Sequence, residues 1–287
     1  MPTPTSRLAA ALPLLLSLAP ACAGDWSDTA LGYRRGQHFA EPYAGNDIGK
    51  AIYSLTHAGS TRLGSQFLNL DLLQSDQRDP VDPGSSQGAR EAYLVYRHTF
   101  DFTRLGGGNW VGGPVRSLGG TLGVDLNHKN DAGYNSRKRM LVAGPTLGFD
   151  VPGFLDLSLL ALWESNAPRN DFTGTTTSRY TYRTHPMLSL AWGLPGQLGG
   201  QRFHFGGYAN FIAAKGRDEF GARTAAETHA DLSLLFEIGA PFGLRPDQLR
   251  LGPAYEYWRN KFGNDSRGPA GPGAWARTPM LRLEYHF

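Results

Sequence analysis

Polar and apolar residues alternate along most of this chain with a period of two. In the stretch QRFHFGGYANFIA (201–213), Phe203 and Phe205 fall on one face of an extended strand, and Arg202 and His204 fall on the other. A sustained period of 3.6 residues, which an amphipathic helix would give, is not found in the same part of the sequence. The alternation therefore predicts β-strands that are apolar on one face and polar on the other.

Twelve segments of this kind predict an all-β fold. They lie at 27–35, 50–58, 62–74, 89–103, 114–127, 138–150, 154–165, 178–193, 201–213, 226–239, 248–260 and 277–287. Many exceed the roughly 5–6 residues that are common for strands of soluble proteins. They match the roughly 9–11 residues that a tilted strand needs to cross a bilayer. We expect a transmembrane antiparallel β-barrel of about 12 strands.

The connections between the segments alternate in length. Short connections rich in glycine and proline are expected at 150–154, 193–201 and 239–248, and longer polar ones at 36–49, 75–88, 127–138, 166–177, 214–225 and 261–276. Outer-membrane barrels have short periplasmic turns and longer external loops. With a periplasmic N-terminus, every long connection falls outside, and an even number of strands returns the C-terminus to the periplasm.

Aromatic residues fall at both rims of the barrel on this topology. Trp26, Trp110 and Trp192 are expected near the periplasmic rim, and Trp163, Tyr180, Tyr182, Tyr255 and Tyr257 near the outer rim. Amphipathic rings suit the headgroup level of a membrane. A soluble β-sandwich or lipocalin-like barrel would also alternate, but its apolar face would point inward, and twelve long strands would be unusual.

The N-terminus carries the one long apolar run, residues 8–23, directly after Arg7. Two prolines interrupt this run, and it is too short for a spanning helix. Ala21-Cys22-Ala23 provides a cleavage site with small residues. We therefore predict that residues 1–23 are a secretory signal peptide and that residues 24–287 form the barrel domain.

Cys22 is the only cysteine and leaves with the predicted signal peptide. A lipoprotein site at Cys22 is the alternative, although Leu18 lies one place too far away for a good lipobox. The mature chain then has no disulfide, no thiolate metal site and no cysteine catalysis, and we expect no metal and no cofactor. The formal net charge of +3 is nearly balanced and argues against a nucleic-acid partner.

Several blocks of sequence together resemble a known family. They are WSDTALGYRRGQHFAEP (26–42), NDIGKAIYSLTHA (46–58), GYANFIAAKGRDEF (207–220), YEYWRNKFGND (255–265) and the closing LRLEYHF (281–287). They resemble the nucleoside-specific channel-forming (Tsx-like) and OmpK-like outer-membrane proteins. The resemblance implies a monomeric twelve-stranded barrel in the outer membrane of a Gram-negative bacterium, with a narrow, porin-like pore that admits nucleosides. It also implies that the barrel assembly machinery recognises the last strand, which ends on Phe287.

The polar face of the predicted strands supplies candidates for a recognition track in the lumen. Aromatic rings can stack on a nucleobase, and asparagine and arginine can bond base edges and ribose hydroxyls. The candidates for the constriction are Tyr93, Arg97, Arg183, Tyr208, Asn210 and Trp258. Alternatively, lumenal charges of opposite sign simply pair, as Arg282 and Glu256 can on adjacent strands. Mixed charge suits an uncharged polar solute better than a phosphate.

The sequence thus favours an outer-membrane channel for passive, selective diffusion of small polar solutes, most of all nucleosides. A receptor or structural barrel without transport is the alternative. An outer-membrane phospholipase would need serine and histidine side by side on the lipid face. His185 and Ser189 share a lumenal phase and lie about 13 Å apart along one strand, so we expect no enzyme. Membrane lipids are expected partners. Arg137-Lys138-Arg139 at the outer rim either binds lipopolysaccharide phosphates or is a solvated basic patch.

Overall fold

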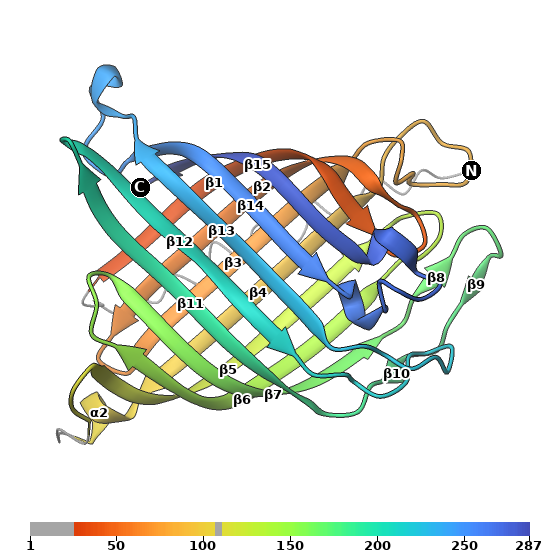
Figure 1. Ribbon diagram of the computed structural model, residues 1–287, viewed down its shortest axis with the longest axis horizontal. Coiled ribbons are helices and arrows are strands. Elements are labelled where there is room, and N and C mark those ends of the chain that lie inside the picture. Colours follow the sequence, from red (N-terminus) through yellow and green to blue (C-terminus); the bar gives the residue numbers. More distant parts are fainter. Residues whose placement is uncertain (1–25, 107–110) are drawn as a thin grey trace, which may run out of the picture.

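A closed antiparallel β-barrel forms the body of the protein in the computed structural model, which describes residues 26–106 and 111–287 (Figure 1). Within these residues, twelve long strands each pair with their neighbours in sequence. The first strand, β1 (Trp26–Glu41), also pairs with the last, β15 (Trp275–His286), from Ala30↔His286 to Gly36↔Met280. This pairing closes the barrel and confirms the predicted fold class.

The wall strands have the following bounds: β1 (Trp26–Glu41), β2 (Gly45–Thr61), β3 (Gly64–Ser75), β4 (Arg90–Asp101), β5 (Val115–Lys129), β6 (Arg137–Phe149), β7 (Phe154–Asn166), β11 (His185–Leu198), β12 (Gln201–Ile212), β13 (Glu227–Glu237), β14 (Leu249–Arg259) and β15 (Trp275–His286). Short elements occupy the connections: α2 (Phe102–Leu105), β8 (Arg169–Asn170), β9 (Thr175–Thr176), β10 (Tyr180–Thr181), η1 (Ala240–Phe242), η2 (Lys261–Gly263) and η3 (Gly271–Ala274).

The connections confirm the predicted segregation of long loops and short turns. One end of the barrel, called the loop end here, carries the connections 42–44, 76–89, 130–136, 167–184, 213–226 and 260–274. The other, the turn end, carries 62–63, 102–106, 111–114, 150–153, 199–200 and 238–248. No helix in the described part of the chain is long and apolar enough to cross a membrane. The predicted signal peptide (1–23) and Trp110 lie outside the described residues.

The first hairpin differs from the prediction, because the loop expected at 36–49 is wrong. β1 and β2 stay paired as far as Glu41 and Gly45, with register shifts on either side of Phe39. Phe39 and Ile48 are almost completely buried in an apolar cluster inside the barrel. Burial of two large side chains stabilises the extended hairpin, which reduces the connection to a three-residue turn.

The predicted strand 178–193 is also wrong in part, because the chain leaves the wall between β10 and β11. The hydroxyl of Tyr182 donates to Glu219, at 2.6 Å. The backbone N–H of Arg183 donates to the carbonyl of Lys215, at 3.2 Å, and not to a wall strand. Contacts with the neighbouring loop therefore replace strand pairing here. At the other end β11 continues to Leu198, so the turn expected at 193–201 is shorter than predicted.

The outer surface of the barrel is apolar and its inner surface is mostly polar. Large hydrophobic side chains are exposed around the wall: Leu31, Tyr53, Leu72, Leu122, Leu141, Leu159, Leu188 and Leu281. Charged residues on the opposite strand face, such as Arg34, Asp125 and Asp231, are buried. A soluble protein places these residue types the other way round, and lipid is the solvent that suits this surface. Trp26 at the turn end and Trp163 near the loop end are exposed, as predicted for aromatic rims.

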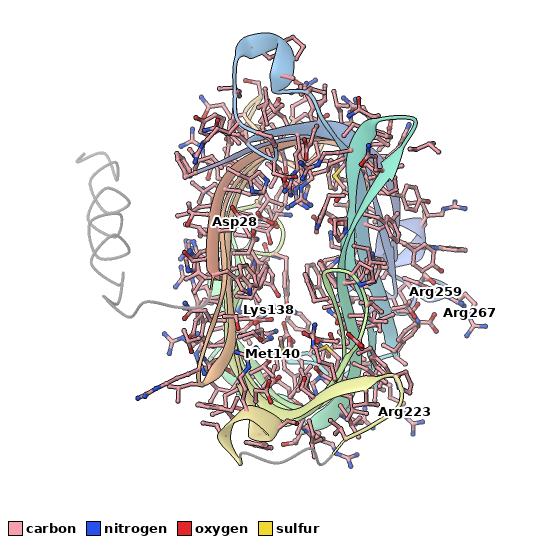
Figure 2. The ribbon with its side chains drawn as sticks, turned by 90° about the vertical axis from the view of Figure 1, so that its left-hand side faces the viewer. Asp28, Lys138, Met140, Arg223, Arg259 and Arg267 are labelled. Atoms are coloured by element: carbon pink, nitrogen blue, oxygen red, sulfur yellow. The ribbon has the colours of Figure 1, made fainter. Side chains whose placement is uncertain are left out.

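Two apolar clusters interrupt the polar lumen on opposite walls. One contains Phe39, Ile48, Ile52, Ala254 and Met280, and the other contains Val142, Leu160, Leu162 and Met187. The inward direction follows from register, because Ile52 lies opposite Arg34 and Leu162 lies opposite His185. Figure 2 looks along the barrel and shows Lys138 and Met140 inside the wall, with Arg259 outside it. These clusters narrow the interior.

Candidate functional site

A cluster of buried charges crosses the lumen near its middle. The guanidinium of Arg34 on β1 bonds Asp71 on β3 at 2.5 Å and Asp231 on β13 at 2.8 Å. The hydroxyl of Ser54 donates to Asp71 at 2.6 Å, and Arg282 lies 3.9 Å from Asp231. We call Arg34, Asp71, Asp231 and Arg282 the central cluster. Because β1 and β13 are not neighbours, Arg34 joins two separate parts of the wall.

An aromatic group lies beside the central cluster on β12, β13 and β14. His229 stacks on Trp258 with ring centroids 3.9 Å apart and planes 10° apart. The ring of Tyr208 meets His229 edge-on, and its hydroxyl lies 3.2 Å from His229 Nε2. Tyr208 is the register partner of Asp231, so the aromatic group and the central cluster share one wall. The indole N–H of Trp258 donates to Glu227 at 3.2 Å.

Three buried polar atoms near Asp231 have no hydrogen-bond partner among the described residues. They are Nε of Arg34, Nε of Arg282 and Oε1 of Glu256. Glu256 is the register partner of Asp231, so the three atoms belong to the same region of the lumen. Buried polar groups in native proteins are nearly always paired. This region of the lumen therefore contains two N–H groups and one carboxylate oxygen that the described residues leave unpaired.

Two predicted site residues lie on a different wall. Tyr93 and Arg97, both on β4, bond the same carboxylate of Asp125 on β5, and the Tyr93 hydroxyl lies 3.1 Å from it. Since β4 and β12 are five strands apart in the order of the wall, Tyr93 and Tyr208 belong to different parts of the lumenal face.

The structure places Asn210 in the lumen and Arg183 elsewhere. The side-chain carbonyl of Asn210 on β12 accepts a hydrogen bond from Ser189 on β11, at 2.6 Å. Arg183 lies in the segment between β10 and β11, is exposed, and packs against Gly216 in the neighbouring loop. The predicted wall position is therefore wrong for Arg183. The other five predicted residues share the lumen face, around Asp125, around His229 and beside Ser189.

Sequence reasoning missed a charged network at the loop end. Lys129 on β5 lies 2.9 Å from Asp79, 3.0 Å from Asp131 and 3.5 Å from Glu41. Lys50 on β2 lies 2.5 Å from Glu41. Asp79 belongs to the connection 76–89, so this loop folds inward and its carboxylate is buried. The network ties β1, β2, β5 and two loops together across the mouth of the barrel.

A second half of the network lies on the opposite side of the mouth. Glu164 on β7 accepts from Lys138 at 2.9 Å and from Lys215 at 3.0 Å. Lys215 also lies 3.7 Å from Glu227, the acceptor for Trp258. Burial lowers the pKa of Lys215, but the carboxylates of Glu164 and Glu227 outweigh burial and raise it overall. Lys215 thus keeps its charge inside the mouth.

The connection 260–274 joins the two halves. Lys261 bonds Glu41 at 3.1 Å, and Lys138 lies over the ring of Phe262 at 4.4 Å from its centroid. Phe262 has a left-handed backbone with φ of 59°, which a bulky residue rarely adopts. The ring is therefore held in the mouth at a conformational cost that the cation–π contact helps to offset. We call the residues around these bridges the lysine mouth.

The lysine mouth contains every lysine of the chain. The five are Lys50, Lys129, Lys138, Lys215 and Lys261, and none has a side chain more than 17% exposed. Lysine is normally a surface residue. The signal was present in the sequence, because all five lie in or directly beside the long connections.

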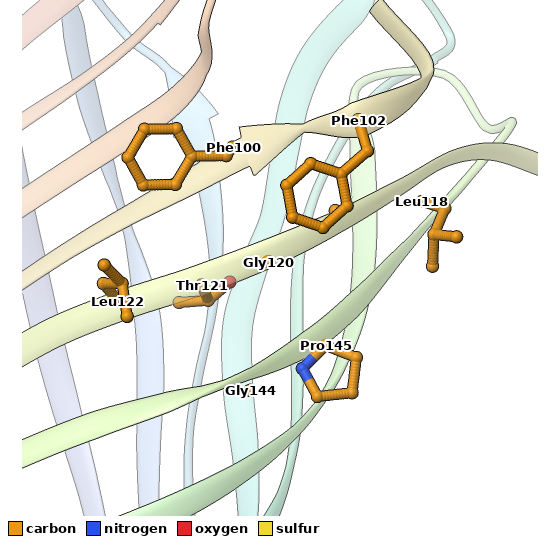
Figure 3. A pocket seen from close by; sticks show the side chains of 9 residues that line it. Phe100, Phe102, Leu118, Gly120, Thr121, Leu122, Gly144 and Pro145 are labelled. Atoms are coloured by element: carbon orange, nitrogen blue, oxygen red, sulfur yellow. The ribbon is translucent and has the colours of Figure 1, made fainter. Parts of the chain in front are cut away.

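An apolar pocket of about 540 Å³ lies on the outer face of the barrel near the turn end (Figure 3). Phe100, Phe102, Leu122 and Pro145 line it. A Cβ atom at Gly120 would lie 2.9 Å from the ring of Phe102, so glycine lets this ring lie against the wall. The pocket faces the lipid side and contains none of the lumenal candidates.

The strand pairing and the apolar outer surface together define the protein as a transmembrane β-barrel. No protein-family model matches the chain, and no curated protein matches its sequence. The Tsx-like resemblance therefore stays a prediction.

Among solved structures, the chain is similar to the translocator domain of the autotransporter NalP from Neisseria meningitidis, with 14% identity, 97% of this chain and 94% of that chain covered, and a TM-score of 0.46. It is also similar to the NanC porin, with 10% identity, 91% of this chain and 99% of that chain covered, and a TM-score of 0.43. The similarity to the KdgM porin has 8% identity, covers 90% of this chain and 98% of that chain, and has a TM-score of 0.39.

Proposed function

We propose that the protein is a monomeric outer-membrane channel through which small polar solutes diffuse passively and selectively, with nucleosides as the leading substrate class. The unpaired polar atoms of Arg34, Arg282 and Glu256 carry this proposal. A barrel with a purely structural interior gains stability by pairing such groups, since an unpaired buried group costs about 1–3 kcal/mol. A passing solute supplies the missing partners.

The aromatic group beside these atoms supports a solute with a flat ring. Tyr208, His229 and Trp258 form a contiguous aromatic group over three adjacent strands, in which His229 covers one face of Trp258. Base–aromatic stacking contributes about 1–3 kcal/mol and tolerates any base. A nucleobase on this surface would place its ribose hydroxyls toward the donors of Arg34 and Arg282, which makes one combined site for both halves of a nucleoside.

The charges of the lumen support an uncharged solute. Arg34 is bonded by two carboxylates, and each lysine of the mouth lies within 4.0 Å of at least one carboxylate. Neither sign dominates, so the lumen has no strong field to concentrate anions or cations. A neutral polar molecule crosses such a wall without displacing a charged partner.

Planar-bilayer conductance of the purified barrel tests the proposal, with nucleosides and sugars of similar size added as blockers. We expect nucleosides to reduce the current in a saturable way and sugars to leave it unchanged. Trp258→Ala should weaken the nucleoside block by about tenfold, because one base-stacking partner is lost. Trp163→Ala is the matched control, since Trp163 is exposed on the outer face. Open channels that ignore nucleosides would leave a general narrow pore and refute the substrate.

A receptor or structural barrel without transport is a second candidate, and the lysine mouth favours it. Ion pairs from β1, β2, β5, β6 and β7 and from four loops converge there, and such a network would hold the loop end rigid enough to bind a partner. If neither the wild-type barrel nor the Phe262→Gly variant, in which the mouth is opened, conducts ions in planar bilayers, a receptor or structural role is favoured over transport.

We also propose that the barrel has no catalytic activity. A lipase would need a serine activated by histidine. His185 Nδ1 instead lies 2.8 Å from the carbonyl of Arg183, and the Ser189 hydroxyl donates to Asn210. Phospholipid hydrolysis by the purified barrel, measured as released fatty acid, would overturn this proposal.

A further inference from the structure

Three arginines gather on the outer surface at the loop end. Arg137 and Arg139 belong to β6, and Arg179 comes from the connection that precedes β10; all three are exposed. Arg179 donates to the Ser165 hydroxyl and to the carbonyl of Arg137, each at 3.1 Å. Nowhere in residues 26–106 or 111–287 does a carboxylate form an ion pair with any of the three. We call them the arginine triad.

The triad is held together against its own repulsion. Partial burial, followed by the positive charges of Arg139 and Arg137, lowers the pKa of Arg179. Like charges at one place on a surface cost free energy unless a counter-charge is bound. Some other exposed arginines of the barrel have a neighbouring acid, as Arg202 has Asp247, whereas the three charges of the triad lie together without one among the described residues. The triad therefore points to an external anion.

A groove of about 320 Å³ runs across the wall, with the arginine triad lining one part of it and aliphatic side chains lining another. Its floor follows one cross-strand row, in which Leu70, Leu94, Leu126 and Arg139 are successive register partners on β3, β4, β5 and β6. The small side chain of Ala92 also lines the groove. The row therefore leads from an aliphatic surface to a guanidinium.

The depth of the triad matches the boundary between lipid headgroups and acyl chains. On β6 the next outward-facing residue after Arg139, toward the middle of the barrel, is Leu141, which is 58% exposed. Leu141 pairs with Trp163, an outward tryptophan of the kind that marks the interface. The groove thus opens to hydrocarbon below and to phosphate groups above.

We propose that the groove binds one phosphorylated glycolipid of the outer leaflet, with its phosphate on the arginine triad and an acyl chain over Leu70, Leu94 and Leu126. Guanidinium groups bind phosphate in a bidentate manner, and they do so more readily than ammonium groups at a partly desolvated surface. A soluble polyanion would use the triad but not the groove, so the two features together specify a lipid. Lys138, which lies between the two arginines in sequence, points inward to Glu164 and takes no part.

The experiment measures lipid retention by the detergent-purified full-length barrel with native mass spectrometry. The probes are bisphosphorylated lipid A, its monophosphorylated form and a phosphate-free lipid of equal chain length, with inorganic phosphate as competitor. We expect one bisphosphorylated lipid A per barrel, weaker retention of the monophosphorylated form and none of the phosphate-free lipid. The double variant Arg137→Gln/Arg139→Gln should weaken binding by about a hundredfold, since a hydrogen bond to a charged group contributes about tenfold or more.

A matched control changes two arginines at the same end of the opposite wall. Arg259 and Arg277 lie over the ring of Trp275, with centroid distances of 5.7 Å and 4.6 Å. Arg259→Gln/Arg277→Gln removes the same charge and should retain lipid A as wild type does. Ala92→Trp keeps every charge and fills the groove, so it should also weaken lipid binding by about tenfold, through lost acyl contact.

Two results would overturn the proposal. Equal losses in the triad variant and the control variant would reduce the effect to general surface charge. Complete competition by inorganic phosphate, with no effect of Ala92→Trp, would show a free-anion site without lipid recognition. Because lipid retention does not require conduction through the lumen, a failure here is distinguishable from a failure of the channel proposal.

Discussion

Replacement of Arg34 by glutamine should destabilise the barrel and alter its conductance together. The substitution removes a guanidinium that bonds Asp71 at 2.5 Å and Asp231 at 2.8 Å, both nearly buried. It leaves two carboxylates without their main partner in the narrow middle of the lumen. Breaking a buried ion pair from one side typically costs about 3–5 kcal/mol, because the remaining charge is uncompensated.

The surroundings of Arg34 place the expected loss at the lower end of this range. Asp71 keeps the hydrogen bond from Ser54, and Asp231 keeps Arg282 at 3.9 Å. We therefore expect Arg34→Gln to lower the free energy of unfolding by about 3 kcal/mol. Asp231→Asn should cost about 1–2 kcal/mol, since Arg34 then still has Asp71. The double variant should cost less than the sum, with a coupling energy of about 1–2 kcal/mol.

Denaturant unfolding in detergent micelles, followed by the mobility shift of folded barrels on gels, measures these free energies. Conductance of the same variants reports the lumen, and Arg34→Gln should raise it and make it more cation-selective, because a positive group is lost beside two carboxylates. A matched control is Arg35→Gln, on the same strand with its side chain on the other face. Unfolding of Arg34→Gln at the wild-type midpoint, or a coupling energy below about 0.5 kcal/mol, would refute the reasoning.

Three further substitutions test other parts of the structure. Phe262→Gly relieves the left-handed backbone and empties part of the lysine mouth, so single-channel conductance should rise while stability changes by about 1 kcal/mol or less; unchanged conductance would contradict a closing role. Gly144→Ala places a Cβ atom 2.0 Å from the carbonyl oxygen of Leu159, so the β6–β7 pairing should weaken and the unfolding midpoint should fall, and a wild-type midpoint would count against the register. Deletion of Phe287 removes the backbone N–H that donates to the carbonyl of Thr29 at 2.9 Å. We expect less folded barrel in membrane fractions, and a normal yield would argue against recognition of the last residue by the assembly machinery.

The strands were predictable because lipid imposes a strict period. A lipid-facing side chain is needed at every second residue of a wall strand, so Phe203, Phe205 and Phe211 reveal β12 without further information. The two errors, at 36–49 and 178–193, arose where the chain leaves the bilayer. There the apolar cluster at Phe39 and the Tyr182–Glu219 bond decide the backbone, and neither contact has a period.

The sequence predicted which strand face the candidate site residues occupy, but it did not predict which side chains they contact. Alternation alone assigned Tyr93, Tyr208 and Trp258 to the lumen. It could not show that His229 would stack on Trp258, because ring contacts across strands depend on register, which is set by turn lengths far from the site. Because register was unknown, Arg282 and Glu256 were expected to pair. Arg282 instead lies near Asp231 and bonds Glu284 at 2.6 Å.

The division between lysine and arginine follows from the geometry of their charges. Lys129 meets three carboxylates from different directions, within 3.5 Å of each, and a compact ammonium with three donors can serve all three at once. A planar guanidinium would fit two of them at most and would need more room than the packed mouth provides. At the outer surface, arginine is the better cation. Arg139 stands beside aliphatic chains, where a weakly hydrated, planar cation loses little on leaving water and can grip a phosphate with two donors. The mouth and the groove therefore use different cations because one closes a network of carboxylates within the chain and the other is left open for a ligand.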